Sequence, residues 1–403
     1  MKTVVTGLGV LAPNGVGTEA FWAATLGGAS GIAPIARFDA SGYPVRLAGE
    51  LTDFDPAQHI PSRLMSQTDA LTQMALAAAD WALADAAIDA KRIDPFDMGV
   101  VTANSVGGFE FGQHELENLW ARGPQYVSAY QCFAWFYAVN TGQISIRHGM
   151  RGPTGVVVSE QAGGLDAVGQ ARRHVRHGTR LLVTGGMEAP LCPWAVAAQI
   201  PNGRLSNSGD PARGYRPFDA EAAGYVIGEG GAILIVEEAA AAWERGAPRT
   251  YGEIAGYQAT FDPRPGAGRP PRLAAAMRGA LEDAELRTED IDVVFADAVG
   301  VPELDLAEAR AIVELFGRFG VPVTAPKTMT GRLNAGGAAL DLALALLTLR
   351  DAVIPPTINT AVLAAGCDID LVTTTRSAPV RNILIAARGY GGFNSAMVVR
   401  AAA

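Results

Sequence analysis

Segments with continuous apolar runs alternate along this chain with segments whose apolar residues recur at helical spacing. Runs rich in Val, Ile and Leu that end in Gly or Pro predict buried strands; they lie at 3–15 (a strand with the turn that follows it), 98–102, 156–158, 180–186, 232–237, 291–297, 322–325, 369–373, 382–387 and 396–400. Apolar residues at helical spacing predict the intervening helices; these cover 18–26, 66–88, 109–121, 134–149, 165–175, 239–245, 272–286, 304–318 and 335–351. This alternation predicts an α/β fold whose sheets are largely parallel and covered by helices on both faces.

The most informative junction follows the apolar run 156–158. The chain turns through Ser159-Glu160-Gln161-Ala162-Gly163-Gly164, and a helical pattern begins at Leu165. A helix tip gathers free N–H groups and the positive end of the helix dipole. Enzymes use such a tip to activate a nucleophile or to hold an oxyanion. The residue presented here is Gln161, whose neutral amide is neither a nucleophile nor a base.

The chain length indicates two domains or a fused repeat. With 403 residues, the chain exceeds one typical hydrophobic core. Glycine-rich strand exits recur in both parts of the sequence, which suggests two related α/β units. We predict an N-terminal half at residues 1–250 and a C-terminal half at 251–403, divided just before the Pro- and Gly-rich stretch 261–271.

Composition excludes several classes of protein. The net charge of −9 disfavours nucleic acid as a partner. Three scattered cysteines are too few for a disulfide framework or a zinc site. No apolar run approaches the length of a membrane span, and the chain opens directly on a core strand. We therefore expect a cytoplasmic protein that binds neither metal nor cofactor and does not associate with a membrane.

Four stretches in the family's order resemble the β-ketoacyl synthases: VVTGLGVLAPNG at 4–15, YRPFDA at 215–220, GYVIGEG at 224–230 and GYGGFN at 389–394. Together they are spread over nearly the whole length of the chain, from residue 4 to residue 394. The resemblance implies the thiolase fold, in which two pseudo-symmetric halves stack as five layers, αβαβα. In active members, the Gly-rich loop at 389–394 flanks the nucleophile and supplies part of the oxyanion hole; here we interpret this loop as structural.

The same resemblance implies that the catalytic positions are degenerate. The family's nucleophilic cysteine corresponds to Gln161, its first histidine to Asp297 and its second to Arg332. All five histidines precede residue 180, so no small shift of register restores a Cys-His-His site. Condensation needs a thiolate and imidazole donors, so we expect that the chain alone is not a condensing enzyme.

Two further family positions are retained, Lys327 and Glu308. In active relatives these residues belong to a buried polar network. We interpret them here as scaffold, because removing one partner of a buried charged pair is costly.

A more specific resemblance comes from SEQAGGLDA at 159–167 together with FAWFYAVNTGQIS at 133–145. These segments are similar to the chain length factors of bacterial aromatic type II polyketide synthases. The resemblance implies a heterodimer with an active ketosynthase α subunit. It also implies that acyl carrier protein supplies malonyl units through this complex and that the growing polyketide chain lies in a tunnel at the interface.

The tunnel is expected along the helix 109–121. Phe109, Gly112 and Leu116 share one face of this helix, and the resemblance makes them the gate that sets chain length. A helical Gly costs about 1 kcal/mol relative to Ala, so we expect open volume over Gly112 and predict a decaketide product.

The aromatic run is expected at the interface. The candidates for contact with the α subunit are Phe133, Trp135 and Phe136. Strand 154–159 would pair with its counterpart in the partner. The arginines after the helix tip suit either an acidic carrier protein or a solvated helix face; they are Arg172, Arg173, Arg176 and Arg180.

Three alternatives stay open at this point. The chain may be read instead as a decarboxylase that primes the synthase by acting on malonyl carrier protein through Gln161. It also fits a chain length factor for reduced polyene chains, because the gate residues do not distinguish the two products. A generic thiolase fits worst, since its nucleophile and base are missing as well.

Overall fold

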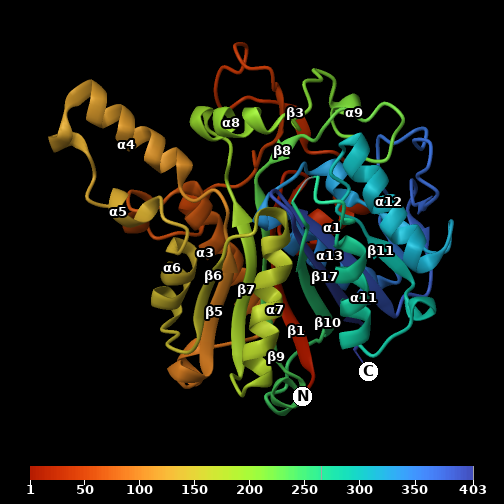
Figure 1. The fold of residues 1–403 in the computed structure, drawn as a ribbon. Coiled ribbons are helices and arrows are strands. Elements are labelled where there is room, and N and C mark those ends of the chain that lie inside the picture. The colour runs from red at the N-terminus through yellow and green to blue at the C-terminus, as the bar shows by residue number, and fades with distance from the viewer. Residues whose placement is uncertain (265, 403) are drawn as a thin grey trace.

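A mixed sheet of 12 strands forms the centre of the computed structural model, which describes residues 1–264 and 266–402 (Figure 1). Five strands of the N-terminal part lie side by side in the order β1 (Thr3–Ala12), β9 (Gly230–Glu238), β7 (Leu181–Glu188), β5 (Met98–Ala103) and β6 (Thr154–Val157). The C-terminal part follows the order β10 (Gly252–Phe261), β17 (Phe393–Arg400), β16 (Asn382–Gly389), β11 (Val293–Phe295) and β12 (Pro322–Thr324). β1 and β10 join the two parts through the pairs Val4–Glu253 and Val5–Gly252.

The two parts have the same topology. From β1 to β6 the successive pairings are antiparallel, antiparallel, parallel and parallel. From β10 to β12 the sequence of pairings is identical. The predicted pair of pseudo-symmetric halves is therefore confirmed.

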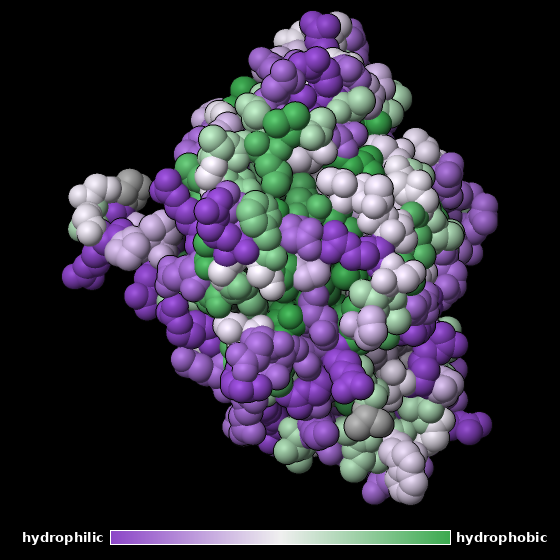
Figure 2. Space-filling model, turned by 90° about the vertical axis from the view of Figure 1, so that its right-hand side faces the viewer, coloured by the Kyte–Doolittle hydropathy of each residue, from purple (hydrophilic) through white to green (hydrophobic). Residues whose placement is uncertain are grey.

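Helices complete the five layers. α7 (Gly163–Arg176) and α13 (Ala335–Asp351) pack against each other and against strands of both halves, so they form the central layer. α13 is buried along almost its whole length, which explains why its sequence is apolar all round. α3 (Ala70–Asp85) and α6 (Val139–His148) cover the N-terminal half, and α11 (Leu273–Asp283) and α12 (Pro302–Phe316) cover the C-terminal half. The face on the right of Figure 1 carries hydrophilic side chains around an apolar centre (Figure 2).

Helix α4 (Phe109–Arg122) and the short α5 (Gln131–Ala134) project from the body as an arm, residues 109–134 (Figure 1). Only Gly112 and Glu115 of α4 are buried. Trp120 at the far end of α4 is 77% exposed. An extended helix with so little burial leaves most of its surface uncovered by the described part of the chain.

A small sheet caps the molecule above the main one, built from β3 (Ile32–Pro34), β4 (Leu47–Gly49) and β8 (Ile227–Gly228) (Figure 1). The remaining elements are α1 (Thr18–Leu26), α2 (Ser62–Met65), α8 (Pro193–Gln199), α9 (Pro211–Gly214), α10 (Ala239–Glu244), β2 (Gly15–Val16), β13 (Val353–Ile354), β14 (Asp370–Leu371) and β15 (Arg376–Ser377). Within the described residues, no helix is long and apolar enough to cross a membrane.

Three expectations from the pattern were wrong. The sheet is mixed rather than largely parallel, because its central strands pair antiparallel. Strand β10 was not predicted, since Gly252–Phe261 mixes apolar and polar residues. The predicted helix 134–149 is broken: α5 ends at Ala134 and α6 begins at Val139. The carbonyl of Trp135 accepts the N–H of Gly108 at the start of α4, and this contact holds the chain out of a continuous helix.

Candidate functional site

Gln161 lies where the sequence placed it, in a single 3-10 turn between β6 and α7. Its side chain is fully buried. Among the described residues, neither its amide nitrogen nor its amide oxygen has a hydrogen-bond partner. A Cβ at Gly337, in the first turn of α13, would come 2.3 Å from Nε2 of Gln161. The amide is therefore packed against α13, and a glycine there makes room for it.

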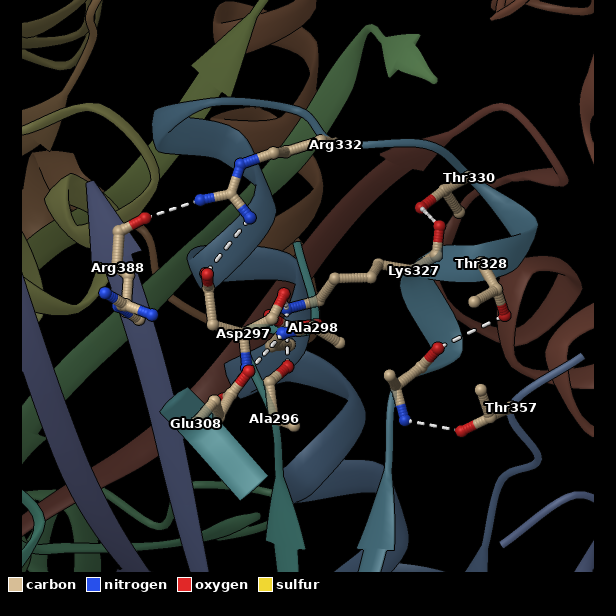
Figure 3. A network of polar contacts seen from close by, with 12 residues as sticks. Ala296, Asp297, Ala298, Glu308, Lys327, Thr328, Thr330, Arg332, Thr357 and Arg388 are labelled. Atoms are coloured by element: carbon tan, nitrogen blue, oxygen red, sulfur yellow. Dashed lines mark hydrogen bonds and ion pairs between the residues drawn. The ribbon is translucent and has the colours of Figure 1, made fainter. Parts of the chain in front are cut away.

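Asp297 and Arg332, which the family resemblance assigns to the positions of the two histidines, meet as a buried ion pair (Figure 3). Nη1 of Arg332 lies 3.1 Å from Oδ1 of Asp297, and Nη2 donates to the carbonyl of Arg388. Burial alone would lower the pKa of Arg332, but Asp297 and Glu160 raise it well above its ordinary value. The site therefore holds a permanent cation and its counter-ion in place of groups that readily exchange a proton at neutral pH.

Glu308 and Lys327 hold the backbone on either side of Asp297 (Figure 3). Glu308 accepts the N–H groups of Asp297 and Ala298 at 2.7 and 2.8 Å. Nζ of Lys327 donates to the carbonyls of Ala296 and Asp297 and lies 2.7 Å from Oδ2 of Asp341 on α13. Burial and the nearby Asp297 raise the pKa of Glu308 to about 7. These two side chains fix the loop that carries Asp297.

A cavity of about 410 Å³ opens beside the ion pair. Asp297 and Arg332 form part of its wall, together with Arg204 and with Arg388–Gly392, the turn between β16 and β17. The Arg204 guanidinium stacks on the ring of Tyr390, 4.9 Å from its centroid. The cavity is lined by charged groups that already pair with one another.

The three gate residues lie on one face of the projecting α4, and Trp194 covers part of it. The ring centroids of Phe109 and Trp194 are 4.5 Å apart. A Cβ at Gly112 would lie 3.3 Å from Cζ3 of Trp194. The space over Gly112 is thus occupied, not open as expected, because α8 brings a tryptophan onto the helix. Leu116, one turn further along, is partly exposed.

Sequence reasoning missed Trp194 because it assigned no helix to Pro193–Gln199. The available signal was Cys192-Pro193, since Cys192 caps α8 and Pro193 occupies its first turn.

The interface candidates follow the break between α5 and α6. Trp135 and Phe136 are 45% and 48% exposed, and Phe133 is half-buried beside Tyr130. β6 is the edge strand at one end of the sheet. Val156 on β6 and Val158, which directly follows β6, are both exposed. An unpaired edge strand with exposed apolar side chains is a ready surface for strand pairing.

Arg172 is removed from the carrier-protein candidates by its burial. Its Nε donates to the carbonyl of Ile254, and Nη1 lies 2.5 Å from Oδ2 of Asp283. Arg172 therefore joins α7 to β10 and α11, whereas Arg173, Arg176 and Arg180 are exposed.

Comparison with known proteins gives one consistent result. The chain matches the β-ketoacyl synthase N-terminal domain over residues 2–242 and the C-terminal domain over 251–361. It is 61% identical to the tetracenomycin polyketide synthase ketoacyl synthase beta subunit of Streptomyces glaucescens, covering 98% of both chains.

Solved structures of ketosynthases have the same fold as this chain. The ishigamide ketosynthase/chain length factor superposes with a TM-score of 0.91 at 28% identity, covering 100% of this chain and 99% of that one. A type II polyketide synthase acyl-carrier protein in complex with its ketosynthase bound to the hexaketide gives 0.89 at 28% identity, with the same coverage of the two chains.

Proposed function

Because the chain belongs to the β-ketoacyl synthase family, as the β subunit or chain length factor of a type II polyketide synthase, we propose that it shapes the cavity in which an active α subunit builds a poly-β-ketone and makes no bond itself. The family resemblance drawn from the sequence is thereby confirmed. Catalytic silence and product length remain our proposals.

The replacement of all three catalytic side chains carries the proposal of silence. Condensation requires a thiolate to hold the chain and donors to stabilise an enolate. Gln161 supplies a buried amide, and the positions of the donors hold the Asp297–Arg332 pair. An aspartate carboxylate opposes a developing enolate, and Arg332 is already engaged by Asp297, Glu160 and the Arg388 carbonyl.

The heterodimer is supported by surface that this chain leaves uncovered. The projecting α4, the short α5 and the edge strand β6 all lie on the left of Figure 1, and Trp135 and Phe136, which follow α5 in the chain, are exposed. We propose that the α subunit covers this surface and that acyl carrier protein reaches the complex to deliver malonyl units. The three cysteines are free, which suits the reducing cytoplasm in which we place the complex.

Chain length is proposed to depend on the face of α4 that carries Phe109, Gly112 and Leu116, now extended by Trp194. These side chains border the end of the tunnel, so their bulk limits the number of ketide units that fit. Because Trp194 occupies the space over Gly112, the proposal of a decaketide product now rests only on the modest size of Gly112 and Leu116.

The test uses the chain co-expressed with its α subunit and its carrier protein. Gly112→Phe should shorten the polyketide measured by mass spectrometry, because a phenylalanine does not fit beside Trp194 without moving it, and the added bulk would narrow the proposed tunnel. Glu117→Phe, an exposed position on the same helix, is the control and should leave the product unchanged. An unaltered product from the Gly112 variant in an intact heterodimer would refute the gate assignment.

A further inference from the structure

Glu160 has a strained backbone for which the local sequence gives no reason. Its φ is 51°, in the left-handed region, where any residue with a Cβ loses free energy and glycine does not. Strain of this kind persists when surrounding contacts hold the residue in place. The contacts of the Glu160 side chain therefore show which interactions hold the backbone in this conformation.

The carboxylate of Glu160 spans two donors from distant parts of the chain. Oε2 accepts the backbone N–H of Tyr390 at 2.8 Å, and Oε1 lies 3.5 Å from Nε of Arg332. Tyr390 belongs to the turn between β16 and β17, and Arg332 precedes α13. Both residues line the 410 Å³ cavity.

These donors have the features of a carboxylate site. The backbone N–H of Tyr390 and the guanidinium of Arg332 converge on Glu160 just before α7, a helix of 14 residues, and such helix ends favour anions. An anion already occupies the donors, and it comes from the chain itself.

We infer that Glu160 is a built-in carboxylate ligand, which closes a site for small carboxylates formed by the Tyr390 N–H and Arg332. The inference rests on the proposed silence of this helix tip. The inference goes beyond that proposal, because it names the side chain of Glu160 as the group that blocks the carboxylate site.

Charge around the cavity supports this assignment. Arg204, Arg332 and Arg388 face it, and Asp262 and Asp297 are its only acidic lining side chains apart from Glu160 at its edge, within the residues that the structure describes. Counted together with the Glu160 carboxylate, these formal charges balance. Removal of Glu160 leaves an excess of one positive charge, which suits a carboxylate.

The variant Glu160→Gly tests the inference directly, since glycine accepts φ 51° and removes the carboxylate. Malonate is the probe, titrated by calorimetry into the purified heterodimer. The variant complex should bind malonate on the order of tenfold more tightly than the wild-type complex. The wild-type complex also measures any malonate that binds to the partner subunit.

Glu285→Gly is the matched control. Glu285 also has a positive φ, of 55°, but its exposed side chain lies at the end of α11, away from the cavity. This substitution relieves equivalent strain and should leave malonate binding at the wild-type level. Equal affinity in the wild-type and Glu160→Gly complexes would overturn the inference.

Crystals of both complexes soaked in malonate give a second, independent measurement. We expect density for malonate between the Tyr390 N–H and Arg332 in the variant, and the Glu160 carboxylate in the wild type. Malonate at these donors in the wild type, with Glu160 displaced, would contradict the inference. Neither measurement depends on product length, so a failure here is distinguishable from a failure of the proposed function.

Discussion

The substitution Arg332→Met tests whether the degenerate site is held closed by a buried ion pair. Arg332 is 4% exposed and Asp297 is 1% exposed. Methionine keeps an apolar chain of similar reach but leaves the carboxylate of Asp297 without its cation. Removing one partner of a buried pair costs roughly 3–5 kcal/mol.

This loss converts into a measurable shift of the melting temperature. At roughly 2.1 cal/mol/K per residue, a chain of 403 residues unfolds with an entropy of about 0.85 kcal/mol/K. The midpoint of thermal unfolding, followed by circular dichroism, should therefore fall by about 4–6 °C.

Two control variants distinguish the loss of the buried ion pair from a general effect of removing a charge. The double variant Asp297→Asn/Arg332→Met removes both charges and should recover most of the loss, since no unpaired charge stays buried. Arg287→Met removes an exposed ion pair and should change stability by less than about 0.5 kcal/mol. If the double variant is as unstable as the single one, the reasoning is wrong.

Three further predictions concern chemistry, chain length and pH. Gln161→Cys alone should give no condensing activity with carrier-bound substrates, because Asp297 and Arg332 remain; product detected by mass spectrometry without the α subunit would contradict this. Trp194→Ala should lengthen the polyketide made by the heterodimer, since it removes the ring that covers Phe109 and Gly112, and an unchanged product length would exclude Trp194 from the gate. Burial raises the pKa of Glu188 to about 8 from 4.5, so the folded state keeps a proton that the unfolded state loses, and the contribution of Glu188 to stability should fall as pH rises between these values, by at most roughly 1.4 kcal/mol per pH unit. Other buried carboxyls such as Glu308 add to the total slope, so Glu188→Gln should reduce the slope in urea titrations by this share; identical slopes would exclude Glu188.

The sequence predicted the architecture best where each element repeats a single spacing. β1 and α13 are apolar at most positions, and both were predicted within a few residues of their ends. β10 alternates less regularly because one end is exposed, and the aromatic run at 135–137 resembles a helix until the Gly108–Trp135 hydrogen bond is known.

The candidate site was predictable in its positions but not in its contacts. The strand-to-helix pattern pointed to Gln161, and the family resemblance pointed to Asp297 and Arg332. Their interactions join residues far apart in the chain: Asp297 and Arg332 are 35 positions apart, and Glu160 and Tyr390 are 230 apart. Such pairings depend on how the two halves pack, which local patterns do not encode.

The central claim is that this subunit sets chain length and leaves bond formation to its partner. The most direct measurement is the mass of the polyketide made by one α subunit, paired first with this chain and then with a second β subunit whose own system makes a chain of different length. We predict that product length follows the β subunit while the α subunit and carrier protein stay the same. A product of one length from both pairs would contradict the account.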